Sequence, residues 1–275
     1  MHVVYSSVPS PLLTMVLRRL FLVSGGLTLF AVTSIASATH SWAGFHWART
    51  ANPFTLKLGD NVASTWDAYL AEASSDWSQS NVLDTSIVPG GTNPKNCRPT
   101  GGRIEVCNAK YGRNGWLGIA QVWVSGNHIT QAVAKMNDTY FNTATYNTPA
   151  WRRLVMCQEI AHGFGLDHQD ENFSNANLGS CMDYTSDPDG PPSNEHPNAH
   201  DFEQLETIYA HLDSFTTLGA ALPGGGNGND VEGDGPSAWG KVLRRDGAGR
   251  PSLHEHDLGH GRKVFTFVIW ADQEE

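Results

Sequence analysis

The sequence has little positive charge. Of its 275 residues, 18 are Lys or Arg and 28 are Asp or Glu, so the formal net charge is -10 at pH 7. Nucleic acids and anionic membrane surfaces are bound through basic faces, so this balance argues against both as main partners. The sequence also lacks the recurring period of solenoid proteins, which excludes a repeat architecture. Its 40% hydrophobic residues are enough for one sizeable core.

The first 38 residues contain no acidic residue, and they lack the uninterrupted run of ~20 apolar residues that a membrane span requires. Arg18 and Arg19 precede a broken apolar stretch, and Ala36-Ser37-Ala38 follows as a small-x-small cleavage pattern. We therefore predict a signal peptide over residues 1–38 and a secreted, extracellular protein with no membrane contact after cleavage. An uncleaved anchor is the alternative.

Cysteine is scarce, and no two of the four cysteines show the two-residue spacing of a zinc knuckle. Export permits disulfides instead. Cys97 and Cys107 bracket a short polar loop, which favours a local bridge between them. This pairing leaves Cys157 with Cys181, and two buried free thiols are the alternative for that second pair.

Residues 39–217 are predicted to form one domain with both strands and helices. Apolar residues alternate with polar ones in the strand segments and recur at helical spacing in the helix segments. Thr148-Pro149 is a helix start signal, and Asn198 or Asp201 could begin a last helix. The expected strands are 54–58, 82–88, 103–106, 116–124 and 128–136, and the expected helices are 63–77, 151–164 and a last one ending near 212.

The composition changes after residue 217. Residues 218–237 are rich in Gly and are predicted to be a flexible linker. Residues 238–275 are predicted to be a small β-rich segment, and its clearest strand is 263–270. This segment is too short to form a large core of its own.

One segment carries side chains with metal-ligand spacing. Gln158 and His162 are four residues apart, so on a helix both lie on the same face and can reach one ion. Glu159 is rotated by about 100° from that face and can contact a metal-bound water without ligating the metal. Gly165 permits a sharp turn, which would bring His168 back as a third ligand.

A second motif follows downstream, where Cys181-Met182-Asp183-Tyr184 begins 13 residues after His168. Together the two motifs resemble those of secreted metzincins, matrixin-like zinc proteases whose pattern is H-E-x-x-H-x-x-G-x-x-H followed by a Met-turn. The first His of that pattern is Gln158 here. The Met-x-Tyr spacing is similar to that of the astacin and serralysin branches.

The resemblance implies an α+β fold: a metzincin-like catalytic domain, with a twisted mixed sheet packed on helices and a short β-rich C-terminal appendage. It implies a Zn2+ cofactor held by Gln158, His162 and His168, and a zinc-activated water with Glu159 as general base. Tyr184 would stabilise the oxyanion, and Met182 would support the site from below. The substrate would be a protein or peptide, bound as an extended strand along residues 116–124.

Gln158 leaves three interpretations open, because an amide oxygen is a poorer zinc donor than imidazole. Gln158 could bind the ion weakly beside the two histidines. A histidine from elsewhere could replace it, and His128, His196 and His200 are the candidates. The metal could also be lost. Retention of Glu159 favours an active enzyme.

We expect a monomeric secreted zinc endopeptidase. The alternative is a catalytically inactive scaffold that binds protein or glycan through the same cleft. A second alternative is a wall-associated adhesin that acts through residues 238–275. Zinc content distinguishes an enzyme from an inactive scaffold.

Overall fold

The structure is a computed structural model that describes residues 1–2, 39–219 and 235–271. The predicted signal peptide lies almost wholly outside the described residues, as does most of the predicted linker, so both stay predictions. Within the described ranges, no helix has the length and apolar character needed to cross a membrane.

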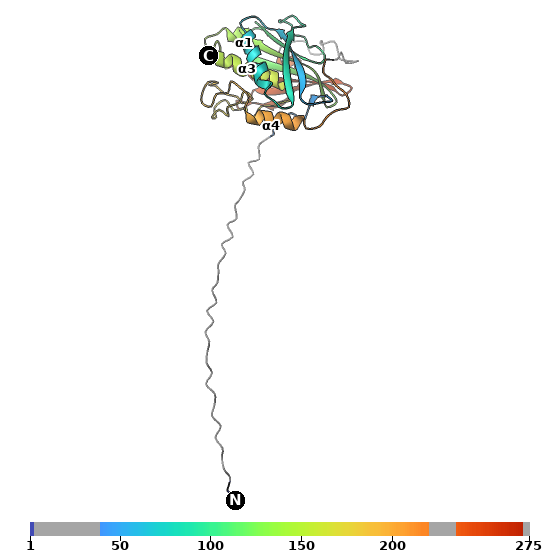
Figure 1. The fold of residues 1–275 in the computed structure, drawn as a ribbon. Coiled ribbons are helices and arrows are strands. Elements are labelled where there is room, and N and C mark those ends of the chain that lie inside the picture. The colour runs from blue at the N-terminus through green and yellow to red at the C-terminus, as the bar shows by residue number, and fades with distance from the viewer. Residues whose placement is uncertain (3–38, 220–234, 272–275) are drawn as a thin grey trace. The chain divides into compact units, whose positions relative to one another are not determined.

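The fold is mixed α and β and is built around one sheet (Figure 1). The strands that precede residues 158–168 along the chain lie in the sheet in the order β3-β2-β4-β6-β5, and β1 pairs with β6. The pairs β2-β3, β2-β4, β4-β6 and β1-β6 are parallel, whereas β5 is antiparallel to β6. These strands are β1 His46–Trp47, β2 Phe54–Asn61, β3 Leu83–Pro89, β4 Ile104–Ala109, β5 Trp116–Ser125 and β6 His128–Asn137.

Helices α1 and α3 lie side by side and pack on this part of the sheet (Figure 1). Helix α3 contains Gln158, Glu159 and His162, and this helix contacts β5 and β6. Helix α4 begins with a capping box, in which the Asn198 side chain accepts from the Asp201 backbone and the Asp201 side chain accepts in return. The helices are α1 Asp67–Trp77, α2 Asp138–Phe141, α3 Pro149–His162 and α4 Ala199–Ile208, with a short 3-10 turn at Pro236–Ala238.

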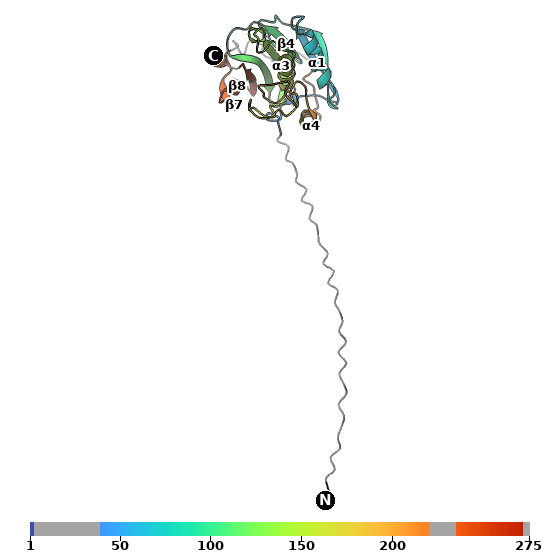
Figure 2. The same cartoon turned by 90° about the vertical axis from the view of Figure 1, so that its left-hand side faces the viewer.

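The C-terminal residues extend the same sheet. Strand β9 (Arg262–Trp270) pairs antiparallel with β5, and β8 (Pro251–Gly259) and β7 (Lys241–Arg245) follow outward from it. Figure 2 shows β7 and β8 on the side of the molecule away from α1. The segment expected as an appendage is thus joined to the preceding part of the sheet by a full strand pairing.

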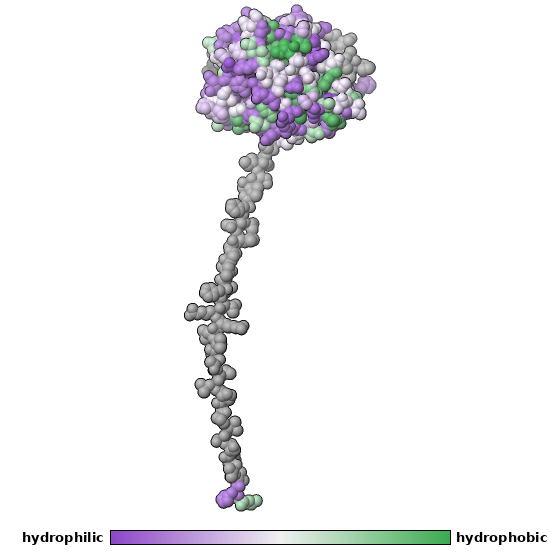
Figure 3. Space-filling model, viewed as in Figure 1, coloured by the Kyte–Doolittle hydropathy of each residue, from purple (hydrophilic) through white to green (hydrophobic). Residues whose placement is uncertain are grey.

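The main core lies between the sheet and the helices and includes large aromatic side chains such as Trp47, Trp66 and Trp77, all fully buried. Few large apolar side chains of the described residues are exposed, and the face in Figure 3 mixes hydrophilic areas with smaller hydrophobic ones. All four cysteines are bridged, Cys97 to Cys107 and Cys157 to Cys181, so both expected pairings are confirmed.

Candidate metal and catalytic site

Helix α3 positions the first three side chains of the site. The Thr148 side chain accepts a hydrogen bond from the backbone N–H of Trp151, and Pro149 occupies the first turn, where its missing N–H leaves no helical bond unmade. The helix then runs to His162. Its last turns carry Gln158, Glu159 and His162, each with at most 1% of its surface exposed.

A tight turn at Gly165 brings His168 back to the helix. Gly165 has φ +100, and a Cβ there would lie 2.4 Å from the carbonyl oxygen of Phe45. Only glycine accommodates both constraints. After the turn, the His168 ring lies 4.5 Å from the His162 ring, centroid to centroid. The structure therefore brings together the two histidines expected to bind one ion.

The two imidazoles face each other through their Nε2 atoms, which are 2.9 Å apart. His162 Nδ1 lies 2.9 Å from the carbonyl oxygen of Leu166, which can only accept, so Nδ1 carries the proton. His168 Nδ1 lies 2.6 Å from the carboxylate of Glu171 and donates to it likewise. With Nδ1 protonated, Nε2 of His162 presents its lone pair to Nε2 of His168, an arrangement that a shared cation stabilises.

Electrostatics agree with this protonation. Burial lowers the pKa of His162 well below its usual value, and the neighbouring His168 lowers it further, so the ring is neutral at pH 7. Burial alone would raise the pKa of Glu171. The hydrogen bond from His168 and the charge of Arg244 outweigh it and lower the pKa, so Glu171 stays ionised as an acceptor.

Gln158 is anchored by one end of its amide. Its Nε2 donates to the carbonyl oxygen of Cys181 at 2.7 Å, whereas its Oε1 is buried without a hydrogen-bond partner. A buried amide oxygen without a partner is costly unless a cation or water satisfies it. Gln158 therefore has a free donor oxygen of the kind that a third ligand needs.

Glu159 is fully enclosed. Both of its carboxylate oxygens are buried and unpartnered, and burial raises the pKa of the group well above its usual value. Strand β5 passes directly over it, since a Cβ at Gly118 would lie 2.7 Å from Glu159 Oε1. The absence of a side chain at Gly118 thus allows the Glu159 carboxyl group to approach β5.

The loop that contains Met182 and Tyr184 is tied to α3. The Cys157–Cys181 disulfide joins α3 to this loop, and Gln169 N donates to Met182 O at 2.7 Å. Met182 and Tyr184 are fully buried. The Tyr184 ring lies 4.5 Å from the His168 ring.

Three supporting residues went unrecognised in the sequence. Glu171 orients His168, and its position three residues later is a local signal that could have found it. Asp201 accepts from Ser180 Oγ at 2.7 Å and thereby holds the Met-turn loop. Arg244 pairs with Asp167 and Glu171 from strand β7, a long-range contact that carries no sequence signal.

The three histidines considered as replacements for Gln158 have partners elsewhere. His128 Nε2 lies 3.1 Å from Asp213 Oδ1, and His196 Nδ1 lies 2.7 Å from Asp76 Oδ2. The His200 ring lies 4.6 Å from the His40 ring. Of the candidates for a third metal ligand, Gln158 is therefore the one that remains available to join His162 and His168.

Strand β9 covers the site. The Phe267 ring stacks on the His162 ring, with centroids 4.0 Å apart and an interplanar angle of 9°. One residue later, the backbone carbonyl of Val268 accepts a hydrogen bond from Tyr184 Oη at 2.7 Å. Under this cover His162 has no exposed surface and His168 keeps 8%.

The donor set fits a zinc ion. Two imidazoles on a tetrahedral zinc, with Zn–N bonds of ~2.0–2.1 Å, hold their nitrogens about 3.3 Å apart. The two Nε2 atoms at 2.9 Å lie near that separation, and a carbonyl and a carboxylate orient the rings from behind. Gln158 and Glu159, in the last turns of the same helix, carry buried oxygens without a hydrogen-bond partner.

No protein-family profile and no curated protein matches the chain. Similar solved structures include that of myroilysin, which is 12% identical, with 60% of this chain and 96% of that chain covered at a TM-score of 0.35. Another is high choriolytic enzyme 1, a hatching-enzyme zinc-protease of the medaka fish Oryzias latipes, at 9% identity, with 62% and 96% covered and a TM-score of 0.35. Likeness at these TM-scores supports no conclusion about this chain.

Proposed function

We propose that this chain is a secreted zinc-dependent endopeptidase. The observation that carries the proposal is the pair of imidazole Nε2 atoms that face each other with their Nδ1 protons committed elsewhere. His162 and His168 would hold the ion, and Gln158 Oε1 would be the third donor. The two disulfides agree with an exported protein.

Zinc, when bound, supplies a Lewis acid that polarises a carbonyl and acidifies a water molecule. A cation held nearby would counter the effect of burial on the pKa of Glu159 and favour its ionised form. The Glu159 carboxylate would then take the proton of the attacking water and pass it to the leaving amine. Tyr184 Oη donates to the carbonyl oxygen as negative charge develops there. The substrate is a protein or peptide, which would lie as an extended strand antiparallel to β5.

Zinc content and hydrolysis test the proposal together. We expect the purified chain to bind zinc at His162 and His168, so that His168→Ala loses one equivalent. The rate at which an unstructured peptide mixture is hydrolysed should depend on Glu159. We would measure this rate in the wild type and in Phe267→Ala, a variant that uncovers His162. Glu159→Gln should abolish this hydrolysis. The matched control is Glu203→Gln, which makes the same substitution at an exposed position of α4 and should leave the rate unchanged.

Two results would contradict the enzyme. Zinc content that His168→Ala leaves unchanged would mean that the two imidazoles do not hold the ion. A second outcome is that zinc binds at this site but neither the wild type nor Phe267→Ala shows hydrolysis that depends on Glu159. That outcome would favour an inactive binding scaffold.

A further inference from the structure

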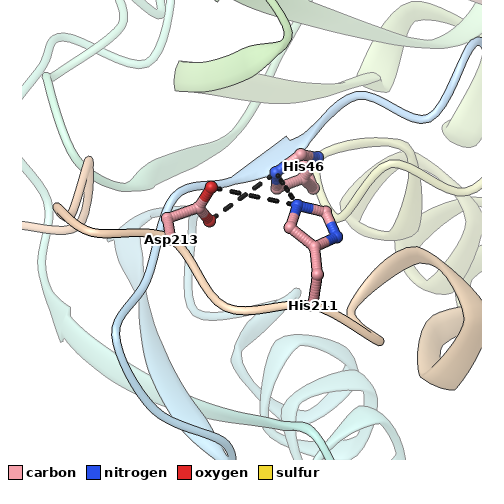
Figure 4. A group of neighbouring side chains, drawn as sticks. All are labelled: His46, His211 and Asp213. Atoms are coloured by element: carbon pink, nitrogen blue, oxygen red, sulfur yellow. Dashed lines mark hydrogen bonds and ion pairs between the residues drawn. The ribbon is translucent and has the colours of Figure 1, made fainter.

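A second group of metal-ligating side chains lies outside this site. His46 of β1, and His211 and Asp213 of the segment that follows α4, converge with their side chains pointing toward one another (Figure 4). Their ligand atoms all lie within 4.8 Å of one another. We call these three residues the surface histidine cluster.

The tautomer of His46 is fixed by its backbone contact. Its Nδ1 lies 2.9 Å from the carbonyl oxygen of Gly44, so Nδ1 carries the proton and Nε2 presents a lone pair. That Nε2 lies 3.1 Å from His211 Nε2. A ring nitrogen aimed at a second ring nitrogen, with its other nitrogen bound to a carbonyl, is the usual orientation of a metal-ligating histidine.

The distances match those of a tetrahedral ion. Ligands at ~2.0–2.2 Å from zinc are separated from each other by about 3.3–3.5 Å. The two Nε2 atoms are 3.1 Å apart, and each approaches a different oxygen of Asp213: His46 Nε2 lies 3.6 Å from Oδ2, and His211 Nε2 lies 3.8 Å from Oδ1. These separations lie near the expected value, and a small rotation of the carboxylate would direct one oxygen to both histidines.

The ligand carboxylate is held in place by its own partners. Asp213 Oδ1 accepts from His128 Nε2 at 3.1 Å, and Oδ2 accepts from the backbone and side chain of Arg49, both at 3.2 Å. These bonds fix the carboxylate orientation, as outer partners do in metal sites. The positive charge of Arg49 offsets part of the attraction for a cation, so we expect this site to bind less tightly than a site with an unpaired Asp.

We propose that His46 Nε2, His211 Nε2 and an Asp213 carboxylate oxygen form a second zinc site, with water as the fourth ligand. His211 is 59% exposed at its side chain, so an ion can enter from solvent and a water can remain bound. Two histidines with one carboxylate suit a borderline-soft divalent ion such as zinc rather than calcium or magnesium. The ion would join β1 to the segment after α4.

Zinc stoichiometry on the full chain tests this site. We expect His211→Asn to lose one zinc equivalent relative to the wild type, with the Co2+-substituted protein losing the matching part of its visible spectrum. The control is His260→Asn, which removes an exposed imidazole outside the cluster. Asp213→Asn should weaken zinc binding by at least tenfold and keep the side-chain shape.

The outcome does not depend on the protease proposal. If the buried site binds no zinc, the wild type holds one equivalent and His211→Asn holds none. Equal zinc content in the wild type, His211→Asn and His260→Asn would overturn the second site. If Asp213→Asn unfolds, the His211→Asn comparison still decides, because that side chain is mostly solvent-exposed.

A different set of contacts concerns access to the buried site. Strand β9 runs antiparallel along β5 through nine residue pairs, which is the position and direction expected of an extended substrate. Ala120 pairs with Phe267 and Ile119 with Val268, so the strand crosses the site at these residues. The Val268 carbonyl accepts from Tyr184 Oη, where the proposed mechanism puts the substrate carbonyl.

The rest of the C-terminal segment (residues 235–271) is fastened to the loop that carries His168. Arg244 pairs with Asp167 and Glu171, and Ser252 Oγ donates to Glu171 at 2.9 Å. The backbone N–H of Gly247 donates to Glu171 O at 2.7 Å. Substrate could reach β5 only after these contacts and the strand pairing had been released.

We infer that β9 is an intramolecular occupant of the substrate position and holds the enzyme latent. This inference rests on the proposed function. Phe267→Ala and Phe267→Asp weaken the cover over His162, and we expect each to raise peptide hydrolysis at least tenfold at unchanged zinc content. The matched control is Leu243→Asp, an exposed apolar residue of β7 that should leave the rate as it is.

A measurement on the wild type covers the case in which the Phe267 variants fail to fold. A peptide hydroxamate should bind the zinc-loaded wild type slowly, at a rate that does not rise with hydroxamate concentration because release of β9 limits it, rather than in one fast step. Fast binding to the wild type, or a wild-type rate equal to that of Phe267→Ala, would overturn the latency. Absence of zinc at His162 and His168 would contradict the protease proposal instead.

Discussion

The histidine pairs of the two proposed metal sites have nearly the same local geometry and different exposure to solvent. In the buried site the Nε2 atoms of His162 and His168 are 2.9 Å apart, and in the surface histidine cluster those of His46 and His211 are 3.1 Å apart. A backbone carbonyl fixes one ring of each pair. The buried pair has no open face toward solvent, whereas His211 is 59% exposed at its side chain.

The third donor differs as well. The buried site offers the neutral amide of Gln158 and keeps the Glu159 carboxyl beside it without a partner, whereas the surface cluster offers the charged carboxylate of Asp213. An unpaired carboxyl beside an ion is suited to proton transfer, while a carboxylate that ligates the ion is suited to structural binding. If both proposed sites bind zinc, the comparison favours chemistry at the buried site and a structural role for the surface cluster.

The largest expected effect separates the two roles. Glu159→Ala should keep both zinc equivalents and lower the peptide hydrolysis rate by at least ~100-fold, since a general base contributes about 10²–10⁴-fold. The rate is best measured in the Phe267→Ala background, where His162 is uncovered. The His211→Asn variant serves as the reciprocal control and should lose zinc but keep the rate. Hydrolysis that persists in Glu159→Ala would remove the mechanism.

The second effect concerns the Cys157–Cys181 bridge, which closes a loop with a sequence separation of 24. Replacing both cysteines by Ser should lower the free energy of unfolding by ~3 kcal/mol in the chain-entropy model. It should also weaken zinc at the buried site, because Cys181 O anchors Gln158. Denaturant unfolding and zinc titration measure the two effects.

The matched control for that bridge is the Cys97 and Cys107 pair, whose separation is 10. Replacing both of these by Ser should cost a similar or slightly smaller free energy and leave both zinc sites unchanged. Equal loss of zinc affinity in the two double variants would show that the Cys157–Cys181 bridge has no specific role at the buried site.

The buried site was largely predictable from the sequence because its donors are local. Helical periodicity places Gln158, Glu159 and His162 within one turn and a glycine returns His168, so spacing alone predicts their meeting. Strands β2 to β6 and helices α1, α3 and α4 were likewise visible as alternation and helical periodicity, whereas the two-residue strand β1 and the four-residue helix α2 are too short to leave such a pattern and were not expected. Both disulfide pairings followed from a local loop and the remaining pair.

The surface cluster and the β9 cover were not predictable, for a common physical reason. His46 and His211 are 165 residues apart, and β5 and β9 pair across more than a hundred residues. Such contacts depend on sheet order and on where α4 ends, neither of which leaves a periodic signal in the chain. The C-terminal segment therefore looked like a separate appendage, although its strands complete the sheet.

The third prediction sharpens the difference in the third donor. Gln158→His should raise zinc affinity at the buried site by roughly tenfold, about 1.4 kcal/mol, because imidazole is a better donor than an amide oxygen. Competition with a chromophoric chelator measures it, and affinity at the surface cluster should not change. If the buried affinity is also unchanged, Gln158 does not contribute a ligand.

The smallest effect probes the outer partner of the surface cluster. His128 donates to Asp213 Oδ1 and packs against the His46 ring, with centroids 4.9 Å apart, but it lies outside the set of three ligand atoms. His128→Phe removes the donor and keeps an aromatic ring in place. Loss of an outer partner costs about 10–100-fold in metal affinity, and Arg49 still holds Oδ2.

We therefore expect the lower end of that range, a roughly tenfold loss at the surface cluster. Zinc affinity at the buried site and the hydrolysis rate should stay at wild-type values, because no contact links His128 to His162 or His168 among those the structure describes. A loss of a full zinc equivalent in His128→Phe would make His128 a direct ligand and the surface site a three-histidine one. An unchanged zinc affinity would mean that Arg49, without His128, is enough to orient the Asp213 carboxylate.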